Sequence, residues 1–259
     1  MLNTKIVKCF LGFPIIYIGF FHRVDCFGGS MKKGLVASLV FLTAGIAFAG
    51  DAAAFKDIGF SSDGNTYIFG QYGKTDVKFQ PYAEIYTIDV AKNEYVPGGV
   101  FKNIDDKSDR SGSQVYEDLY ARHYLEIKNY GCKNAVADDI LYILEDGVKK
   151  GTDEIAFKNY GGSAAEEQVS YAVRLVPTYG GSGANCLSSF YIDLGIEKGG
   201  TSKKYKVGSP DIKRKGVVNY KIVRILRNSA KTALVFVVEK TIEDASGLSI
   251  RYMVETIKL

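Results

Sequence analysis

The sequence predicts a mainly β protein with a two-helix insertion, and three observations lead to that prediction. Apolar or alternating segments of strand length recur between residues 55 and 257. Glycine-containing loops separate several of them, and glycine supplies 28 of the 259 residues. Only residues 112–147 carry the three- and four-residue apolar spacing that is typical of helices. We expect β-meanders in a propeller-blade-like or sandwich-like arrangement, with an α+β fold as the alternative.

Residues 55–90 show the strand pattern most clearly. Residues 61–64, Ser-Ser-Asp-Gly, predict a tight turn, because Asp63 can bond its own backbone and Gly64 accepts a positive φ. Residues 67–69 form an apolar run too short for a helix, and residues 84–90 alternate polar and apolar side chains. This order of turn, aromatic run, loop and alternating strand resembles a single propeller blade.

The N-terminal region carries an export signal that begins at a second methionine, Met31. Two lysines follow it, then an apolar stretch over residues 35–48 with small residues at its end. This order is that of a secretory signal peptide, and we expect cleavage between Ala49 and Gly50. Residues 1–30 are then expected to be an upstream extension assigned to the protein in error, with Met31 as the true initiator.

An alternative reading of the same region is two membrane segments, at residues 10–21 and 35–48. Each is shorter than the roughly 20 apolar residues that a spanning helix needs, and Pro14 interrupts the first. We therefore expect no transmembrane span in the mature chain. Residues 50–259 are expected to form one exported domain, periplasmic or secreted, because no Pro- or Ser-rich linker divides them.

Removal of the signal region changes what the charge implies. Residues 1–49 hold five basic residues and one acidic residue, a surplus of four that equals the formal net charge of +4. The mature chain is therefore formally neutral, and its composition does not indicate nucleic-acid binding.

The apolar spacing in residues 112–131 predicts a helix, whose face comprises Tyr116, Leu119, Tyr120, His123, Tyr124 and Ile127. A second short helix is expected from an N-cap at Asn134 to Gly147. Further strands are expected at residues 155–160, 169–176, 187–194, 205–207, 217–226, 233–239 and 249–257. The hairpin pattern of residues 225–240 repeats that of residues 58–74, which suggests related meanders at both ends of the domain.

Two cysteines remain after processing, Cys132 and Cys186. An exported protein meets an oxidising compartment, so a disulfide between them is possible. The alternative is two buried thiols that act as small hydrophobic residues.

The mature chain offers few residues for catalysis. Its one histidine, His123, lies on the apolar face of a predicted helix, which favours a packing role over a catalytic one. No glycine-rich segment matches a phosphate or dinucleotide motif, and the cluster Asp105, Asp106 and Asp109 lacks the ligand spacing of a calcium loop. We therefore predict no cofactor, no metal site and no catalytic residue.

Two acidic pairs remain as candidates for general acid–base chemistry, Asp138-Asp139 and Glu166-Glu167. Adjacent acids are more typical of solvated turns. A carboxylate-dependent envelope hydrolase is therefore kept as an alternative function, and a non-enzymatic role is favoured.

The residues between 198 and 231 favour binding, because they include eleven basic side chains and one acidic side chain. The candidate basic surface within this segment comprises Lys203, Lys204, Lys206, Lys213, Arg214 and Lys215. Such a surface would attract an anionic envelope polymer or an acidic envelope protein. The alternative is ordinary solvent-facing positions on strands. We expect a binding or structural module of the cell envelope, or else a subunit of an envelope complex.

The segments FKDIGFSSDGNTYIFGQYG and PYAEIYTIDV, the export signal and the C-terminal RYMVETIKL resemble a bacterial family described as predicted secreted proteins with a domain of unknown function, DUF2259. The resemblance covers most of the mature chain. It implies export and a shared domain, and it implies no activity, because the family has no assigned catalytic residues.

Overall fold

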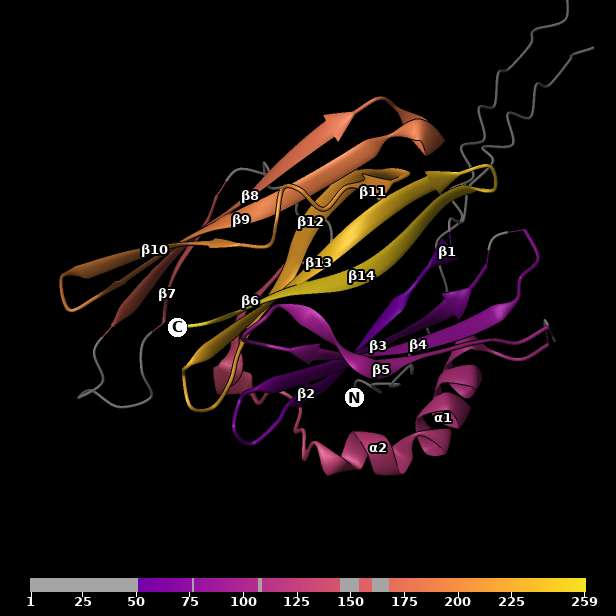
Figure 1. Ribbon diagram of the computed structural model, residues 1–259, viewed down its shortest axis with the longest axis horizontal. Coiled ribbons are helices and arrows are strands. Elements are labelled where there is room, and N and C mark those ends of the chain that lie inside the picture. Colours follow the sequence, from indigo (N-terminus) through magenta and orange to yellow (C-terminus); the bar gives the residue numbers. More distant parts are fainter. Residues whose placement is uncertain (1–50, 76, 107–108, 145–153, 160–167) are drawn as a thin grey trace, which may run out of the picture. The chain divides into compact units, whose positions relative to one another are not determined.

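The computed structural model describes residues 51–75, 77–106, 109–144, 154–159 and 168–259. The expected upstream extension at residues 1–30, the signal peptide at residues 31–49 and the cleavage site between Ala49 and Gly50 lie outside these residues. The described part of the chain forms three β-sheets and two α-helices (Figure 1). The prediction of a mainly β protein is therefore confirmed.

The helix-side sheet is an antiparallel meander of β2 (Ala54–Phe60), β3 (Thr66–Lys74), β4 (Pro81–Asp89) and β5 (Glu94–Ile104). The β2–β3 turn forms as the sequence predicts: the Ser61 hydroxyl donates to Asp63 (2.6 Å), and Gly64 adopts a φ of 67°. The sequence did not indicate β5, because a bulge that contains two glycines interrupts its alternation. The pairing register with β4 shifts at that bulge.

Two helices follow this sheet, α1 (Gly112–Arg122) and α2 (Tyr124–Asn129). Ser111 caps α1 through a capping box, in which its hydroxyl accepts from the Gln114 amide (3.2 Å) and the Gln114 side chain accepts from the Ser111 amide (2.7 Å). Val115 and Leu119 are buried against the helix-side sheet.

The second helix expected from residue 134 to residue 147 is replaced, over its described residues, by a 3₁₀ turn (Ala137–Asp139) and the strand β6 (Ile140–Ile143). The physical reason is tertiary: β6 pairs with the edge of β12, which satisfies backbone groups of both strands. Four consecutive apolar residues fit this edge as well as they fit a helical face. Residues 145–147 lie outside the described residues.

The central sheet has the strand order β1-β14-β13-β12-β6. Its long strands are β12 (Val217–Arg227), β13 (Ala233–Asp244) and β14 (Gly247–Lys258), and the two-residue strand β1 (Asp51–Ala52) pairs in parallel with β14. The first six residues of β13 are all buried, on both faces of the strand. Such a pattern is expected only for a sheet that is covered on both sides.

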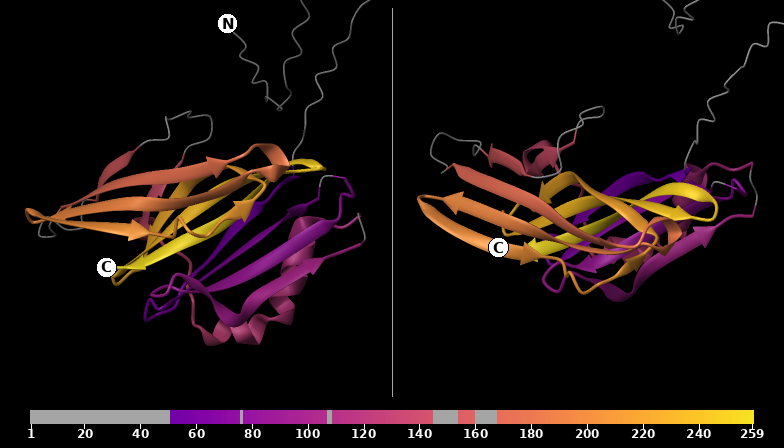
Figure 2. Two further views of the ribbon diagram at one scale, coloured as in Figure 1. Left: turned by 45° about the horizontal axis from the view of Figure 1, so that its top comes forward. Right: turned by 90° about the horizontal axis from the view of Figure 1, so that it is seen from above.

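The outer sheet has the order β10-β9-β8-β7, built from β7 (Ile155–Asn159), β8 (Val169–Gly180), β9 (Leu187–Lys198) and β10 (Thr201–Val207). The short strand β11 (Arg214–Lys215) also pairs with β9. The central sheet lies between the helix-side sheet and the outer sheet, as two further views show (Figure 2). Helices α1 and α2 cover the other face of the helix-side sheet.

Alternating side chains of β13 build the two cores of this stack. Leu234, Phe236 and Val238 pack with residues of the outer sheet, while Val235 and Val237 pack with residues of the helix-side sheet. Successive side chains of a strand point to opposite faces, so one strand supplies both cores. The sheets are thus layered in the manner of a sandwich, and the propeller-blade resemblance is limited to the four-stranded meander.

The two hairpins with similar sequence patterns, β2–β3 and β12–β13, lie in different sheets and pack face to face. Their turns also meet: a Cβ atom added at Gly64 would overlap the side chain of Asn228. Asn228 organises its own turn by accepting hydrogen bonds from the amides of Thr232 (2.8 Å) and Ala233 (2.9 Å).

Candidate functional site

The candidate basic residues follow one edge of a single strand, β9. Along its other edge β9 pairs with β8 over the whole of its length. The edge that remains carries β10, opposite residues 192–198, and then β11, opposite residues 187–188. The six basic residues from Lys203 to Lys215 therefore share a sheet edge, although they are separated by a loop.

These six side chains do not share one face of the sheet. Lys206 lies over the ring of Tyr191 (4.2 Å), and the Lys213 ammonium donates to Ser189 Oγ (3.0 Å). By contrast, Arg214 lies over the ring of Phe190 (4.9 Å), a residue of the core between the outer and central sheets. The sequence predicted a single basic surface, whereas the strand alternation divides it.

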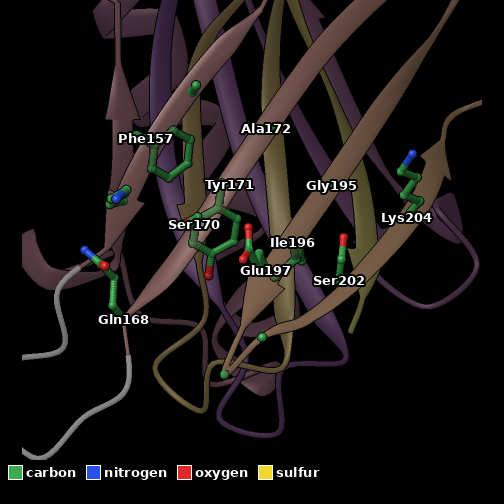
Figure 3. A pocket seen from close by; sticks show the side chains of 14 residues that line it. Phe157, Gln168, Ser170, Tyr171, Ala172, Gly195, Ile196, Glu197, Ser202 and Lys204 are labelled. Carbon is green, nitrogen blue, oxygen red and sulfur yellow. The ribbon is translucent and has the colours of Figure 1, made fainter.

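The outer sheet carries a shallow hollow of about 750 Å³ (Figure 3). Two cross-strand rows supply most of its lining. One row runs Ala156, Ala172, Gly195 and Lys204, and the next runs Lys158, Ser170, Glu197 and Ser202. Because three of the four residues in the first row are small, a ligand there would approach the sheet closely.

Charged side chains surround this floor of small residues. Lys158 lies on one edge strand of the outer sheet and Lys204 on the other, and both are exposed. Among the described residues, neither of these ammonium groups has an ion-pair partner. In the cross-strand row on the other side of Ala172 and Gly195, Arg174 and Asp193 form an ion pair (2.8 Å), so these two charges neutralise each other.

A second group of charged side chains lies along β14, and we call it the β14 charge cluster. Its members are Asp51, Glu84, Lys102, Arg214, Lys240, Arg251 and Glu255, and they come from all three sheets. Six of them form ion pairs: Lys102 with Glu84 (3.2 Å), Arg214 with Glu255 (3.5 Å), and Arg251 with Asp51.

Glu84 is the most firmly held carboxylate of this cluster. It accepts hydrogen bonds from the Tyr86 hydroxyl (2.6 Å) and from the Gln71 amide (2.7 Å). Burial acts to raise the pKa of Glu84, but these hydrogen bonds and the Lys102 charge outweigh it and lower the pKa overall. At Glu255 the balance is reversed, because burial outweighs the Asn93 hydrogen bond and the Arg214 charge and raises the pKa.

Lys240 is the one member of the cluster that has no hydrogen-bond or ion-pair partner among the described residues. Burial lowers its pKa to about 8, and the positive charges of Arg214, Lys102 and Arg251 act in the same direction against that of Glu84. Sequence reasoning missed this residue. The signal was present, since Lys240 continues the alternate apolar positions 234, 236 and 238 of one strand face.

The two cysteines lie in different parts of the stack, and both are free thiols. Cys132 packs beside the cluster between the helices and the helix-side sheet, whereas Cys186 is buried just before β9. In this structure Cys132 and Cys186 are not joined by a disulfide. Burial raises the pKa of Cys132 to about 12, which suppresses its thiolate form.

The remaining candidates for chemistry take part in local structure. The His123 ring stacks on Phe101 with 3.8 Å between ring centroids, as expected for a packing role. Asp139 is buried and accepts from the Ser229 hydroxyl (2.8 Å), whereas Asp138 is exposed. Glu166 and Glu167 lie outside the described residues.

The cluster Asp105, Asp106 and Asp109 shows no metal-binding arrangement, since Asp105 pairs with Arg110 (2.7 Å) and Asp106 accepts from Gln80 (2.8 Å). Across the part of the chain that the structure describes, no group of three or more His, Cys, Asp or Glu side chains is placed to hold a metal ion. No helix in the same residues is long and apolar enough to cross a membrane.

The fold and these surfaces define a mainly β protein of three stacked sheets with charged groups along one edge of the outer sheet. The sequence profile of a family described as predicted secreted protein (DUF2259) matches residues 68–258. The chain belongs to this family, as its sequence resemblance indicated. No match was found to a curated protein or to a solved structure.

Proposed function

We propose that the protein is an exported binding module of the cell envelope, and that its outer sheet binds an extended anionic polymer. The observation that carries the proposal is the hollow across four strands, with an exposed lysine on each edge strand. Between the lysines lie small residues and one carboxylate, Glu197. Exposed, unpaired ammonium groups attract anions at little desolvation cost.

The spacing of the two lysines favours an extended ligand over a single small anion. The backbones of Lys158 and Lys204 are separated by three interstrand spacings, about 14 Å, and are offset by two residues along the strands, about 7 Å. A single phosphate or carboxylate group would contact both ammonium groups only if the two side chains extended toward each other across the sheet. A polymer with repeated negative charges can contact both, and its backbone would lie over Ala172 and Gly195.

The export part of the proposal is that residues 31–49 are a signal peptide and that cleavage leaves Gly50 as the first residue. It is supported by the position of β1, which begins at Asp51. The Asp51 carboxylate pairs with Arg251 and accepts from the Tyr82 hydroxyl (3.2 Å), so cleavage before Gly50 would leave these contacts intact. N-terminal sequencing of the native protein tests this, and any peptide from residues 2–30 would contradict it.

The binding part is tested with the purified protein and a linear polyphosphate, with neutral dextran as the uncharged polymer. We expect the wild type to bind polyphosphate at low ionic strength and to ignore dextran. In the double variant K158A/K204A, two contacts of about 1 kcal/mol each are lost, which weakens binding about 30-fold. Fluorescence anisotropy of labelled polymer measures the affinity.

A matched control is K92A/K128A, which removes one lysine from the β4–β5 turn and one from α2. If binding depends only on net charge, both double variants will weaken it equally and the proposed surface is wrong. Vesicles that contain phosphatidylglycerol form a separate arm. Binding to vesicles but not to polyphosphate would replace the polymer with a lipid surface.

A further inference from the structure

Glu197 places a carboxylate in the floor of the hollow. It lies on β9 and is exposed, and among the described residues its side chain forms no ion pair and no hydrogen bond. It is on the same face of the outer sheet as Lys158 and Lys204, because alternate positions of a strand share a face. A carboxylate beside the path of a polyanion repels it, so the binding of a purely anionic polymer leaves Glu197 unexplained.

Two serines flank Glu197 in its cross-strand row. Ser170 of β8 is paired with Glu197 on one side and Ser202 of β10 on the other, and all three residues line the hollow (Figure 3). Residues directly opposite each other in neighbouring strands have Cβ atoms about 4.5–5.5 Å apart. Within the described part of the chain, neither serine hydroxyl has another hydrogen-bond partner. The row therefore presents three neighbouring groups that can accept hydrogen bonds.

We propose that Ser170, Glu197 and Ser202 bind a primary ammonium group, so that the polymer held by the hollow carries amines as well as anionic groups. A primary ammonium has three N–H donors and one positive charge. The row offers one carboxylate to match the charge and a hydroxyl on each side to accept the remaining donors. The inference rests on the proposed function, because it concerns a second kind of group on the same polymer.

The positions of the three charged residues fit a polymer whose amines lie between its anionic groups. The backbone of Glu197 is two interstrand spacings, about 10 Å, from that of Lys158 in the same row. Glu197 is also the diagonal neighbour of Lys204 on the adjacent strand, about 7–8 Å away. One segment of polymer can therefore place an anionic group at each lysine and an amine at Glu197.

The experiment compares two forms of one polymer, poly(glycerol phosphate) with and without aminoacyl esters that carry a free amine. Fluorescence anisotropy measures both affinities at constant ionic strength and at about pH 6.5, where an α-amine is protonated. Net charge alone would make the amine-bearing form the weaker ligand, because each amine cancels one negative charge. We expect the wild type to bind the amine-bearing form about threefold to fivefold more tightly than the plain form. In E197Q this preference should be lost, while the plain polymer should bind at least as tightly as before.

The matched control is E94Q, the same substitution at an exposed glutamate of β5. It changes the net charge equally and should keep the wild-type preference. The double variant S170A/S202A keeps the carboxylate and removes both hydroxyls, so it should show a smaller preference than the wild type. Circular dichroism establishes that each variant is folded.

A wild-type preference for the plain polymer, or a preference for the amine-bearing polymer that E197Q retains, would overturn the inference and leave the proposed polyanion binding intact. Loss of the preference in E94Q as well would assign it to net charge. No binding of either polymer would refute the proposed function together with the inference. Vesicles that contain phosphatidylethanolamine present ammonium and phosphate groups on a lipid. Binding to these vesicles without binding to the amine-bearing polymer would contradict the assignment to a polymer.

Discussion

Replacement of Lys240 by methionine should stabilise the protein at neutral pH. Methionine keeps the length of the buried stem and removes a charge that has no partner among the described residues. The pKa of Lys240 falls from 10.5 to about 8 on folding, mainly through burial. One pKa unit corresponds to about 1.4 kcal/mol. The shift therefore lowers the free energy of unfolding by about 3 kcal/mol at any pH where Lys240 is protonated in both the folded and the unfolded chain. Partial solvent exposure reduces the expected gain in unfolding free energy to about 1–3 kcal/mol.

The sign of the pH dependence follows from proton binding. Below about pH 8 both the folded and the unfolded chain carry the proton on Lys240, so the penalty is constant. Between about pH 8 and 10.5 the unfolded chain binds more protons at this residue than the folded chain, so this contribution to stability rises with pH. The advantage of K240M over the wild type should therefore shrink across that window and vanish near its upper end.

Urea unfolding from pH 6 to 10.5, in chloride buffers without phosphate or carboxylate ions, measures this difference. Tyrosines and Cys132 also titrate at alkaline pH, but their effects cancel when the two proteins are compared. The control is K221M, because Lys221 is more exposed and pairs with Glu239 (3.0 Å). It should lose up to about 1 kcal/mol without the same pH dependence. A K240M protein that is less stable at pH 7, or a difference that does not change with pH, would refute the reasoning.

Three further predictions concern the fold. A free-thiol assay of the non-reduced chain that begins at Gly50 should count two thiols, Cys132 and Cys186, and a count of zero would indicate a disulfide between them. Phe236→Ala, at a fully buried position of β13, should cost about 3–5 kcal/mol in urea unfolding, and a cost below about 1 kcal/mol would contradict the burial of that ring. Gly59→Ala should lower the free energy of unfolding by about 2 kcal/mol or more, because Gly59 has a φ of 107° and a Cβ atom there would overlap the Lys133 carbonyl. An unchanged melting temperature would show that the Gly59 and Lys133 backbones do not lie this close together.

The strands of the β2–β3 and β12–β13 hairpins were predicted correctly, because the turn residues and the apolar pattern that specify them lie within the hairpins themselves. The β2–β3 turn has both the side-chain acceptor and the glycine that the geometry requires, and the turn formed as expected. β6 was missed because its state depends on a distant partner. The four residues of that strand pair with β12, about 80 residues later in the chain, and nothing local distinguishes them from a short helix.

The basic segment shows a similar limit. Its charges are plain in the sequence, but the division between faces depends on the pairing of β10 and β11 with β9. Gly208 and Pro210 lie between β10 and β11 and interrupt the strand alternation. The sequence therefore does not show on which face of the sheet the residues after the loop lie. The sequence therefore predicted which residues are basic and left open which of them share a surface.

The β14 charge cluster could be predicted only in part, and the reason lies in how its charges are distributed along the chain. The alternation of β13 places Lys240 on a core face, so a buried lysine could have been inferred from sequence. Its neighbours Glu84 and Lys102 come from a different sheet, and Arg214 comes from a strand of two residues. The chain beyond residue 49 is formally neutral, which conceals a local excess of one positive charge. Only the folded structure reveals which three cations are paired with carboxylates, and therefore that Lys240 has no such partner among the described residues.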